Sequence, residues 1–233
     1  MNEILILDCY INERPAWPNF VALMPGRAHR AIRVAKETAP ADIDGFAGLM
    51  LTGGGASAVD GATWLEPVYD LIREARNRAL PTLGICFGHQ LIPRALFGAS
   101  SIRRAPRSEF GWREISCTTP NQLLEGVPER FECFLSHSDE VTPGIPELDV
   151  FAHSERCEVQ GYQVRGLPMW GLQFHPEMPL DESTRLVHSN LARHAHIKET
   201  PEELLSHAVD ARPLGLQLFA NFLATVDATA STA

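Results

Sequence analysis

Residues 81–97, with the sequence PTLGICFGHQLIPRALF, predict a buried strand, a tight turn at Cys86 and then a helix. The apolar run that opens this stretch is typical of an interior strand in a parallel sheet. Gly84 and Gly88 flank the cysteine at positions i−2 and i+2, which is the spacing of a nucleophile elbow. Because the turn places the sulfur at a helix N-terminus, where unpaired N–H groups favour a thiolate, we expect Cys86 to be a nucleophile. The alternative is a structural cysteine at the end of a core strand.

The size and composition of the chain favour one domain in a reducing compartment. With 233 residues, we expect a single domain over residues 1–227 and a disordered tail over residues 228–233. The five cysteines are an odd number without a close pair, which favours the cytoplasm over a disulfide framework or a zinc site. We expect no membrane span and no signal peptide, and the formal net charge of −9 disfavours nucleic acid and anionic membranes as partners.

The order of the predicted elements indicates an α/β fold with a doubly wound, mostly parallel sheet flanked by helices. The first half predicts interior strands at 4–7, 46–51 and 81–85, an edge strand at 30–36, at most one short helix before residue 27, and a helix at 63–80. Alternating apolar and polar residues then predict a small antiparallel addition, with strands at 112–117, 131–136, 149–152 and 158–164. A last apolar strand is expected at 168–174. Two helices follow it, at 181–198 and 202–226, and the second helix has a break at 213–215.

A glycine-rich loop, TGGGAS at residues 52–57, follows a predicted parallel strand. It lies at the sheet edge where open α/β folds bind ligands. A phosphate cradle is one interpretation, but the lysine of a Walker loop and a Gly-x-Gly-x-x-Gly pattern are both absent from it. We favour a loop whose bare N–H groups stabilise a developing oxyanion, with a flexible turn as the remaining alternative.

The strand at 168–174 ends at His175-Pro176-Glu177. A carboxylate two residues after a histidine can accept from one ring nitrogen and fix the tautomer, which leaves the other nitrogen free to act on a thiol. Cys86, His175 and Glu177 therefore form a candidate set of nucleophile, base and orienting residue. We expect neither a cofactor nor a metal, because His194-x-His196 does not have the helical spacing of metal ligands.

Three motifs together resemble the class I (triad-type) glutamine amidotransferases, most of all the glutaminase domain of the GMP synthase subgroup. They are GICFGHQ at 84–90, LTGGG at 51–55 and GLQFHPE at 171–177, and the resemblance covers most of the chain in the same order. It implies a flavodoxin-like fold. The chain departs from the family pattern at Gly55, where proline is common, and at Pro93 after the elbow. We expect no synthetase domain after the glutaminase-like domain, so the resemblance leaves the ammonia acceptor unidentified.

The resemblance also implies roles for individual residues. Cys86 is the expected nucleophile towards the side-chain amide of glutamine, His175 the base for the thiol and the acid for departing ammonia, and Glu177 its orienting partner. The implied oxyanion hole consists of the backbone N–H groups of Gly54 and Phe87. The implied substrate-binding residues, the last three of them through their main chain, are Gly55, Gln90, Ser136, His137 and Ser138.

Three hypotheses for the function remain open. The first is a glutamine amidotransferase subunit that feeds ammonia to a separate synthetase. The second is a stand-alone γ-glutamyl peptidase or amidase that uses the same triad on γ-glutamyl compounds. The third is a non-catalytic binding module that retains the fold.

Overall fold

The computed structural model describes residues 3–194 and 197–231. Five strands form the parallel part of one sheet: β1 (Glu3–Asp8), β2 (His29–Arg33), β3 (Phe46–Leu51), β4 (Thr82–Ile85) and β9 (Met169–Leu172). The antiparallel part consists of β5 (Ile102–Cys117), β6 (Arg130–Val141), β7 (Leu148–His153) and β8 (Gly161–Val164). The strand order is β2-β1-β3-β4-β9-β8-β7-β5-β6. The predicted α/β fold, with a parallel core and an antiparallel addition, is therefore confirmed.

Six α-helices are present among the described residues: α1 (Trp17–Ala22), α2 (Leu65–Asn77), α3 (Phe87–Phe97), α4 (Leu180–Asn190), α5 (Pro201–Leu205) and α6 (Arg212–Ala230). Short 3₁₀ turns lie at Ala99–Ser101, Gln122–Leu124 and Leu191–Arg193. None of these described helices combines the length and the apolar character needed to cross a bilayer.

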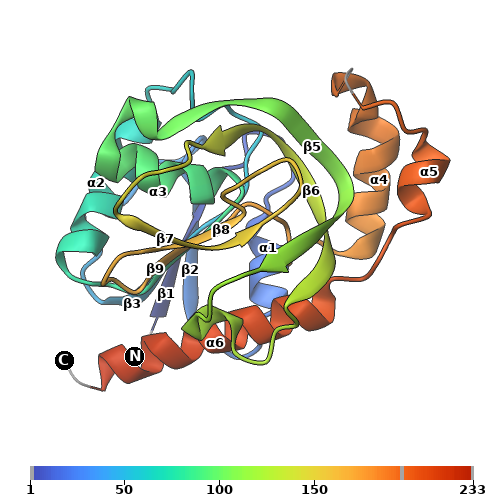
Figure 1. Ribbon diagram of the computed structural model, residues 1–233. Coiled ribbons are helices and arrows are strands. Elements are labelled where there is room, and N and C mark those ends of the chain that lie inside the picture. The colour runs from blue at the N-terminus through green and yellow to red at the C-terminus, as the bar shows by residue number, and fades with distance from the viewer. Residues whose placement is uncertain (1–2, 195–196, 232–233) are drawn as a thin grey trace.

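Helices cover both faces of the parallel strands. Successive side chains of a strand point to opposite faces of the sheet, so apolar residues on both faces need to be covered. Leu5 and Leu7 of β1 belong to the core beneath α2 and α3, whereas Ile4 and Ile6 belong to the core beneath α1 and α6. Figure 1 shows α2 and α3 on one side of the molecule and α6 running along another. Both faces of the sheet are thus sealed, and its carboxyl edge is left to carry the site.

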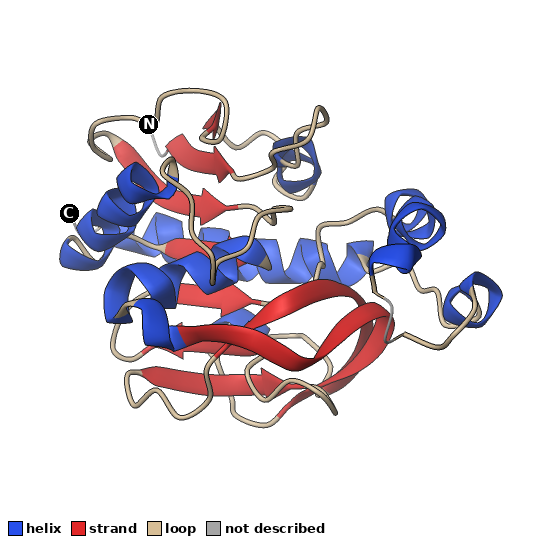
Figure 2. Ribbon diagram, turned by 90° about the horizontal axis from the view of Figure 1, so that it is seen from above, coloured by secondary structure: helices blue, strands red, loops and turns tan. Residues whose placement is uncertain are grey.

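The antiparallel part curls back over that edge. β6 is the last strand in the sheet order, yet its Phe134 carbonyl accepts a 2.9 Å hydrogen bond from the N–H of His175, just beyond β9 in the middle of the sheet. The long β5–β6 ribbon sweeps across the molecule in Figure 1, and α4 and α5 stand beside its curved end in Figure 2. These helices cover the ribbon through a third apolar cluster that includes Phe110, Trp112 and Leu204.

The predictions for the last helices were partly wrong. The predicted helix at 181–198 ends at Asn190 and is followed by a 3₁₀ turn, and the break expected at 213–215 lies instead between Leu205 and Arg212. Pro213 sits in the first turn of α6, where a missing N–H is tolerated. Gly215 lies within α6 and does not break it. A Cβ at this position would lie 2.3 Å from the Pro176 carbonyl oxygen, so the glycine allows the helix to pack closely against this residue. α6 also extends to Ala230, past residue 228 where a disordered tail was expected; residues 232–233 lie outside the described residues.

Candidate active site

The turn at Cys86 has the strained backbone of a nucleophile elbow. Cys86 adopts φ 51° and ψ −100° between β4 and α3, a conformation that is rare for a residue with a Cβ. A Cβ at Gly84 would lie 2.4 Å from the Gly88 carbonyl oxygen, and a Cβ at Gly88 would lie 2.4 Å from the Leu51 carbonyl oxygen. Both approaches are to backbone atoms, so the two glycines allow α3 to start directly against β3 and β4.

His175 and Glu177 lie beside this turn because β4 and β9 are parallel neighbours. Ile85 pairs with Leu172, so the residues that follow the two strands leave the same sheet edge. Nδ1 of His175 and Oε1 of Glu177 are 2.8 Å apart, and both side chains are buried. A Cβ at Gly53 would lie 3.1 Å from Cε1 of His175 and 3.6 Å from Cβ of Cys86, which places both side chains against the same loop residue. The structure therefore brings the three predicted residues together.

The surroundings of His175 favour its charged form. Burial by itself lowers the pKa of the imidazole, but the negative charges of Glu177 and Cys86, and its side-chain hydrogen bonds with them, raise it well above the usual 6.5. With Nδ1 committed to Glu177, the other ring nitrogen is the one left for the thiol. The arrangement suits a thiolate–imidazolium pair.

The predicted oxyanion donors lie next to each other. A Cβ at Gly54 would lie 3.0 Å from the Phe87 ring, and within the described chain neither the Gly54 nor the Phe87 N–H donates a backbone hydrogen bond. The glycine loop is held from below by Thr52: Cys9 N–H donates to Thr52 Oγ1 at 3.0 Å, and Thr52 Oγ1 donates to the Gly53 carbonyl at 2.8 Å. Gly54 and Phe87, the two predicted donors, thus pack against each other where the glycine loop, which is tied to the end of β1, adjoins α3.

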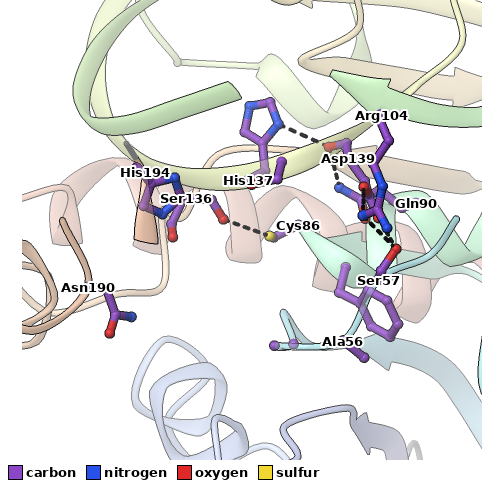
Figure 3. A pocket seen from close by; sticks show the side chains of 14 residues that line it. Ala56, Ser57, Cys86, Gln90, Arg104, Ser136, His137, Asp139, Asn190 and His194 are labelled. Atoms are coloured by element: carbon purple, nitrogen blue, oxygen red, sulfur yellow. Dashed lines mark hydrogen bonds and ion pairs between the residues drawn. The ribbon is translucent and has the colours of Figure 1, made fainter. Parts of the chain in front are cut away.

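A cavity of about 260 Å³ opens in front of Cys86. Gly54, Phe87 and all five predicted substrate-binding residues line it, from the glycine loop, α3 and β6, namely Gly55, Gln90, Ser136, His137 and Ser138. The Cys86 sulfur lies 3.8 Å from the Ser136 carbonyl oxygen, and Figure 3 shows the side chains around it. The cavity is large enough to admit a small amino acid derivative while keeping the sulfur at its base.

Two of the predicted binding residues have their side chains committed to the protein. Gln90 Nε2 donates to the Asp139 carbonyl at 2.8 Å and to Gln173 Oε1 at 2.9 Å. The His137 ring points away from Cys86 in Figure 3 and contacts Asp139 and Glu109. Of His137, therefore, only the main chain is available to a ligand, as the resemblance implied.

Sequence reasoning missed an ion-pair cluster at the rim of the cavity. Arg104 Nη1 lies 2.7 Å from Asp139 Oδ1, and its Nη2 lies 2.6 Å from Asp60 Oδ2. Ser57 Oγ donates to Asp139 Oδ2 at 2.6 Å. The cluster fastens the end of the glycine loop to β5 and β6. No local pattern indicates it, because the side chains that contact each other in these three pairs are 35 to 82 residues apart in the sequence.

Three other residues around the cavity were also missed. The Tyr10 ring lies beside Gly53, 3.7 Å from the position of a Cβ there. Burial, together with the charges of Cys86 and Glu177, raises the pKa of the Tyr10 hydroxyl above its usual 10, so it stays protonated. Asn190 and His194 line the cavity from the end of α4 and the turn after it. His196, named in the sequence analysis, lies outside the described residues.

One group of side chains could hold a metal by proximity alone. Ligand atoms of Glu109, His137 and Cys157 all lie within 4.8 Å of one another among the described residues. Burial raises the pKa of the Cys157 thiol, and the neighbouring Glu109 and Glu140 raise it further, so the sulfur remains a thiol rather than a ligating thiolate. Both ring nitrogens of His137 are already hydrogen-bonded. The group is therefore a hydrogen-bonded network and a poor metal site.

Comparisons with known proteins identify the family. The family model for glutamine amidotransferase class-I matches residues 27–194. A glutamine-hydrolyzing GMP synthase subunit of Methanococcus aeolicus is 32% identical over 178 residues, which covers 72% of this chain and 89% of that protein. The corresponding GMP synthase subunit of Methanopyrus kandleri is 32% identical over 160 residues, covering 69% of this chain and 82% of that protein.

Solved structures share the fold over nearly the whole chain. A glutamine amido transferase from Methylobacillus flagellatus superposes with a TM-score of 0.80 at 25% identity, covering 96% of this chain and 94% of that chain. A glutamine amidotransferase from Thermotoga maritima gives a TM-score of 0.77 at 20% identity, covering 96% and 97%. Since the family model spans well over half of the sequence, this chain belongs to the class I glutamine amidotransferases, a family of glutamine-hydrolysing enzymes.

Proposed function

We propose that Cys86, His175 and Glu177 hydrolyse the side-chain amide of glutamine through a γ-glutamyl thioester, and that the ammonia serves a separate acceptor enzyme. The observation that carries this proposal is the His175 ring, held by Glu177 at 2.8 Å and lying with Cys86 against Gly53. A nucleophile on a strained turn, a base and an orienting carboxylate are the three parts that covalent amide cleavage requires.

The proposed reaction begins from a thiolate–imidazolium pair. The Cys86 sulfur attacks the amide carbon of glutamine, and the N–H groups of Gly54 and Phe87 stabilise the resulting oxyanion. His175 then gives its proton to the departing nitrogen, which leaves as ammonia while the thioester forms. Neutral His175 next takes a proton from water, whose oxygen attacks the thioester carbon. The tetrahedral intermediate then expels the Cys86 thiolate, so glutamate leaves and the thiolate–imidazolium pair is restored.

The cavity supplies the binding half of the proposal. We assign the amino-acid end of glutamine to the main chain of Ser136, His137 and Ser138, with Gly55 and Gln90 lining the remaining wall. A neutral, zwitterionic substrate suits main-chain donors and acceptors better than a single charged side chain would.

The relatives favour a separate acceptor over a stand-alone peptidase. Both GMP synthase relatives are named as one subunit of that enzyme, and such a name implies at least one other subunit. We therefore propose a synthetase partner for this chain as well. The γ-glutamyl peptidase hypothesis uses the same triad and differs only in the group that leaves, so a substrate comparison separates the two.

The test is ammonia release from glutamine by the purified protein. Cys86→Ala is expected to lower kcat by more than ~10³-fold, because no other group can form the thioester. Cys117→Ala is the matched control, since burial and Glu129 raise the pKa of the Cys117 thiol to about 11 and it lies away from the cavity. A Cys86→Ala protein as active as the wild type would refute the assignment. Cleavage of γ-glutamyl peptides in preference to glutamine would favour the stand-alone peptidase hypothesis over the synthetase partner.

A further inference from the structure

An irregularity in β5 frees one residue of the cavity wall from strand pairing. Arg104 pairs with Asp139 and Glu109 pairs with His137, so residues 105–108 of β5 stand opposite Ser138 alone. A bulge of this kind leaves main-chain groups outside the ladder. Ser138 lines the cavity and has no paired residue on β5.

A buried histidine–carboxyl pair lies directly behind this opening. His137 Nε2 is 3.0 Å from Glu109 Oε2, and His137 Nδ1 is 3.0 Å from the Asp139 carbonyl oxygen. Both ring nitrogens are therefore hydrogen-bonded, and the ring is held on both sides. The two side chains are each 1% exposed.

The carboxylate itself is held from a third direction. Ser154 Oγ donates to Glu109 Oε1 at 2.8 Å, and Gln160 Nε2 donates to Glu109 Oε2 at 2.7 Å. Both donors belong to the segment between β7 and β8. A fully hydrogen-bonded buried carboxylate is a fixed point, and His137 is tied to it on one side and to the Asp139 carbonyl on the other.

The same carbonyl connects the pair to the nucleophile helix. Gln90 Nε2 donates to the Asp139 carbonyl, which therefore accepts from both Gln90 and His137. Gln90 lies on α3, one turn after Cys86, and its N–H donates to the Cys86 carbonyl at 3.1 Å. A continuous chain of hydrogen bonds thus runs from Glu109 to the turn that carries the sulfur.

We propose that Glu109 is a positioning residue for glutamine: through His137 it fixes the main chain of Ser136–Ser138 at the distance from Cys86 that the substrate needs. This inference rests on the proposed function. Glu109 does not touch the cavity in front of Cys86 itself, so its effect passes through His137.

Replacing the carboxylate with an amide isolates the charge. In Glu109→Gln, the amide oxygen can still accept from His137 and the amide nitrogen can donate to Ser154, so the shape of the network is kept. The amide is a weaker hydrogen-bond partner than the carboxylate for the buried ring, so the contact that holds His137 Nε2 is weakened. The segment that grips the substrate should then loosen while the elbow stays in place.

The experiment compares substrate binding with intrinsic cysteine reactivity. We expect Glu109→Gln to raise the KM for glutamine roughly ten- to a hundredfold, the value of one charge-assisted hydrogen bond. We expect kcat to change less than about threefold, and the rate of Cys86 alkylation by iodoacetamide, which needs no amino-acid grip, to match the wild type. A general structural defect would instead change all three.

Glu140→Gln is the matched control. Glu140, on β6, is also a carboxylate with 1% exposure, but it pairs with Arg103 and does not line the cavity. We expect its KM to equal that of the wild type. If Glu109→Gln fails to fold, Ser154→Ala removes one hydrogen bond to Glu109 and is expected to raise KM by about threefold.

The outcomes separate this inference from the proposed function. Wild-type glutaminase activity with an unchanged KM in Glu109→Gln, or in Ser154→Ala should that be the variant that folds, overturns the positioning role alone. A parallel fall in alkylation rate and kcat in Glu109→Gln overturns it too, in favour of a structural role. A wild-type protein without Cys86-dependent activity on glutamine overturns the proposed function, and the inference with it.

Discussion

Gly84→Ala tests whether the nucleophile turn depends on the close approach of two backbones. The added Cβ would lie 2.4 Å from the carbonyl oxygen and 2.5 Å from the carbonyl carbon of Gly88, well inside the 3.0 Å that real Cβ atoms respect. Both atoms belong to the first turn of α3, so no side chain can rotate away. Overpacking in cores costs ~1–3 kcal/mol, and we expect the upper end of that range here. Moving α3 to relieve the contact would also displace Cys86, for which a shift of ~1 Å is worth about a hundredfold in rate.

The assay for this variant is guanidinium unfolding followed by tryptophan fluorescence, with glutaminase activity measured on the same preparation. The free energy of unfolding in water comes from linear extrapolation. Gly55→Ala is the control for stability, because its Cβ would lie 3.7 Å from Ile11 Cγ1, an ordinary contact, and we expect a change within ~0.5 kcal/mol. If Gly84→Ala also unfolds within ~0.5 kcal/mol of the wild type and keeps its rate, the close-approach argument for the elbow is wrong.

Three further changes test the site and the core. Glu177→Gln removes a charge that raises the pKa of His175, so kcat should fall by ~10²–10⁴-fold. Because the pKa of His175 is raised in the folded protein, protonation of His175 stabilises the fold fully below pH ~6.5, and this stabilisation is lost as the pH rises through the folded pKa. The difference in unfolding free energy between wild type and Glu177→Gln should therefore shrink as the pH rises. A difference that stays constant with pH would contradict this assignment. Arg104→Gln should change the unfolding free energy by less than ~1 kcal/mol, because the guanidinium is half exposed, yet raise KM by loosening the rim; an unchanged KM would show that the rim does not position the substrate. Phe222→Ala in α6 should cost ~3–5 kcal/mol in denaturant unfolding without changing KM, and a loss below ~1 kcal/mol would mean that α6 is not part of the core.

The parallel half of the fold could be predicted because its signals are local. Short apolar runs bounded by glycine and proline, with one amphipathic helix between them, fix both the type and the order of β1, β3, α2 and β4. The nucleophile turn was equally accessible, since Gly84, Cys86 and Gly88 are neighbours in the sequence. Each of these predictions used residues within about one element of each other.

The antiparallel half was predicted in outline, with three of its four strands too short and the strand predicted at 158–164 longer than β8. β5 spans Ile102–Cys117, whereas only 112–117 was predicted. The first part of this strand contains Pro106 and several arginines, a composition that argues against a strand when read alone. It pairs because β6 lies beside it, and the bulge at 105–108 accommodates the proline outside the ladder. The first part of β5 can therefore be recognised as a strand only when its pairing with β6 is known.

The same limit explains the missed site residues. Asp8 accepts hydrogen bonds from the N–H groups of Tyr10, Ala16 and Trp17, and so shapes the loop that carries Tyr10 to the site. An aspartate at a strand end is too common to single out. Glu109 was equally inconspicuous, because its partners lie on other elements and the pairing follows from the curl of the sheet.

That curl decides where the site can be. Cys86 and His175 follow adjacent parallel strands, so the parallel core alone places the proposed nucleophile and the proposed base together. The proposed binding wall at Ser136–Ser138 belongs to β6, which is four strands beyond β9 in the sheet order and would be remote from it in a flat sheet. The hydrogen bond from the His175 N–H to the Phe134 carbonyl shows that the antiparallel strands bend far enough to return β6 to the catalytic edge. The proposed catalytic residues and the proposed binding residues therefore belong to different parts of one sheet, and we expect changes in β5 or β6 to alter KM before they alter the chemistry at Cys86.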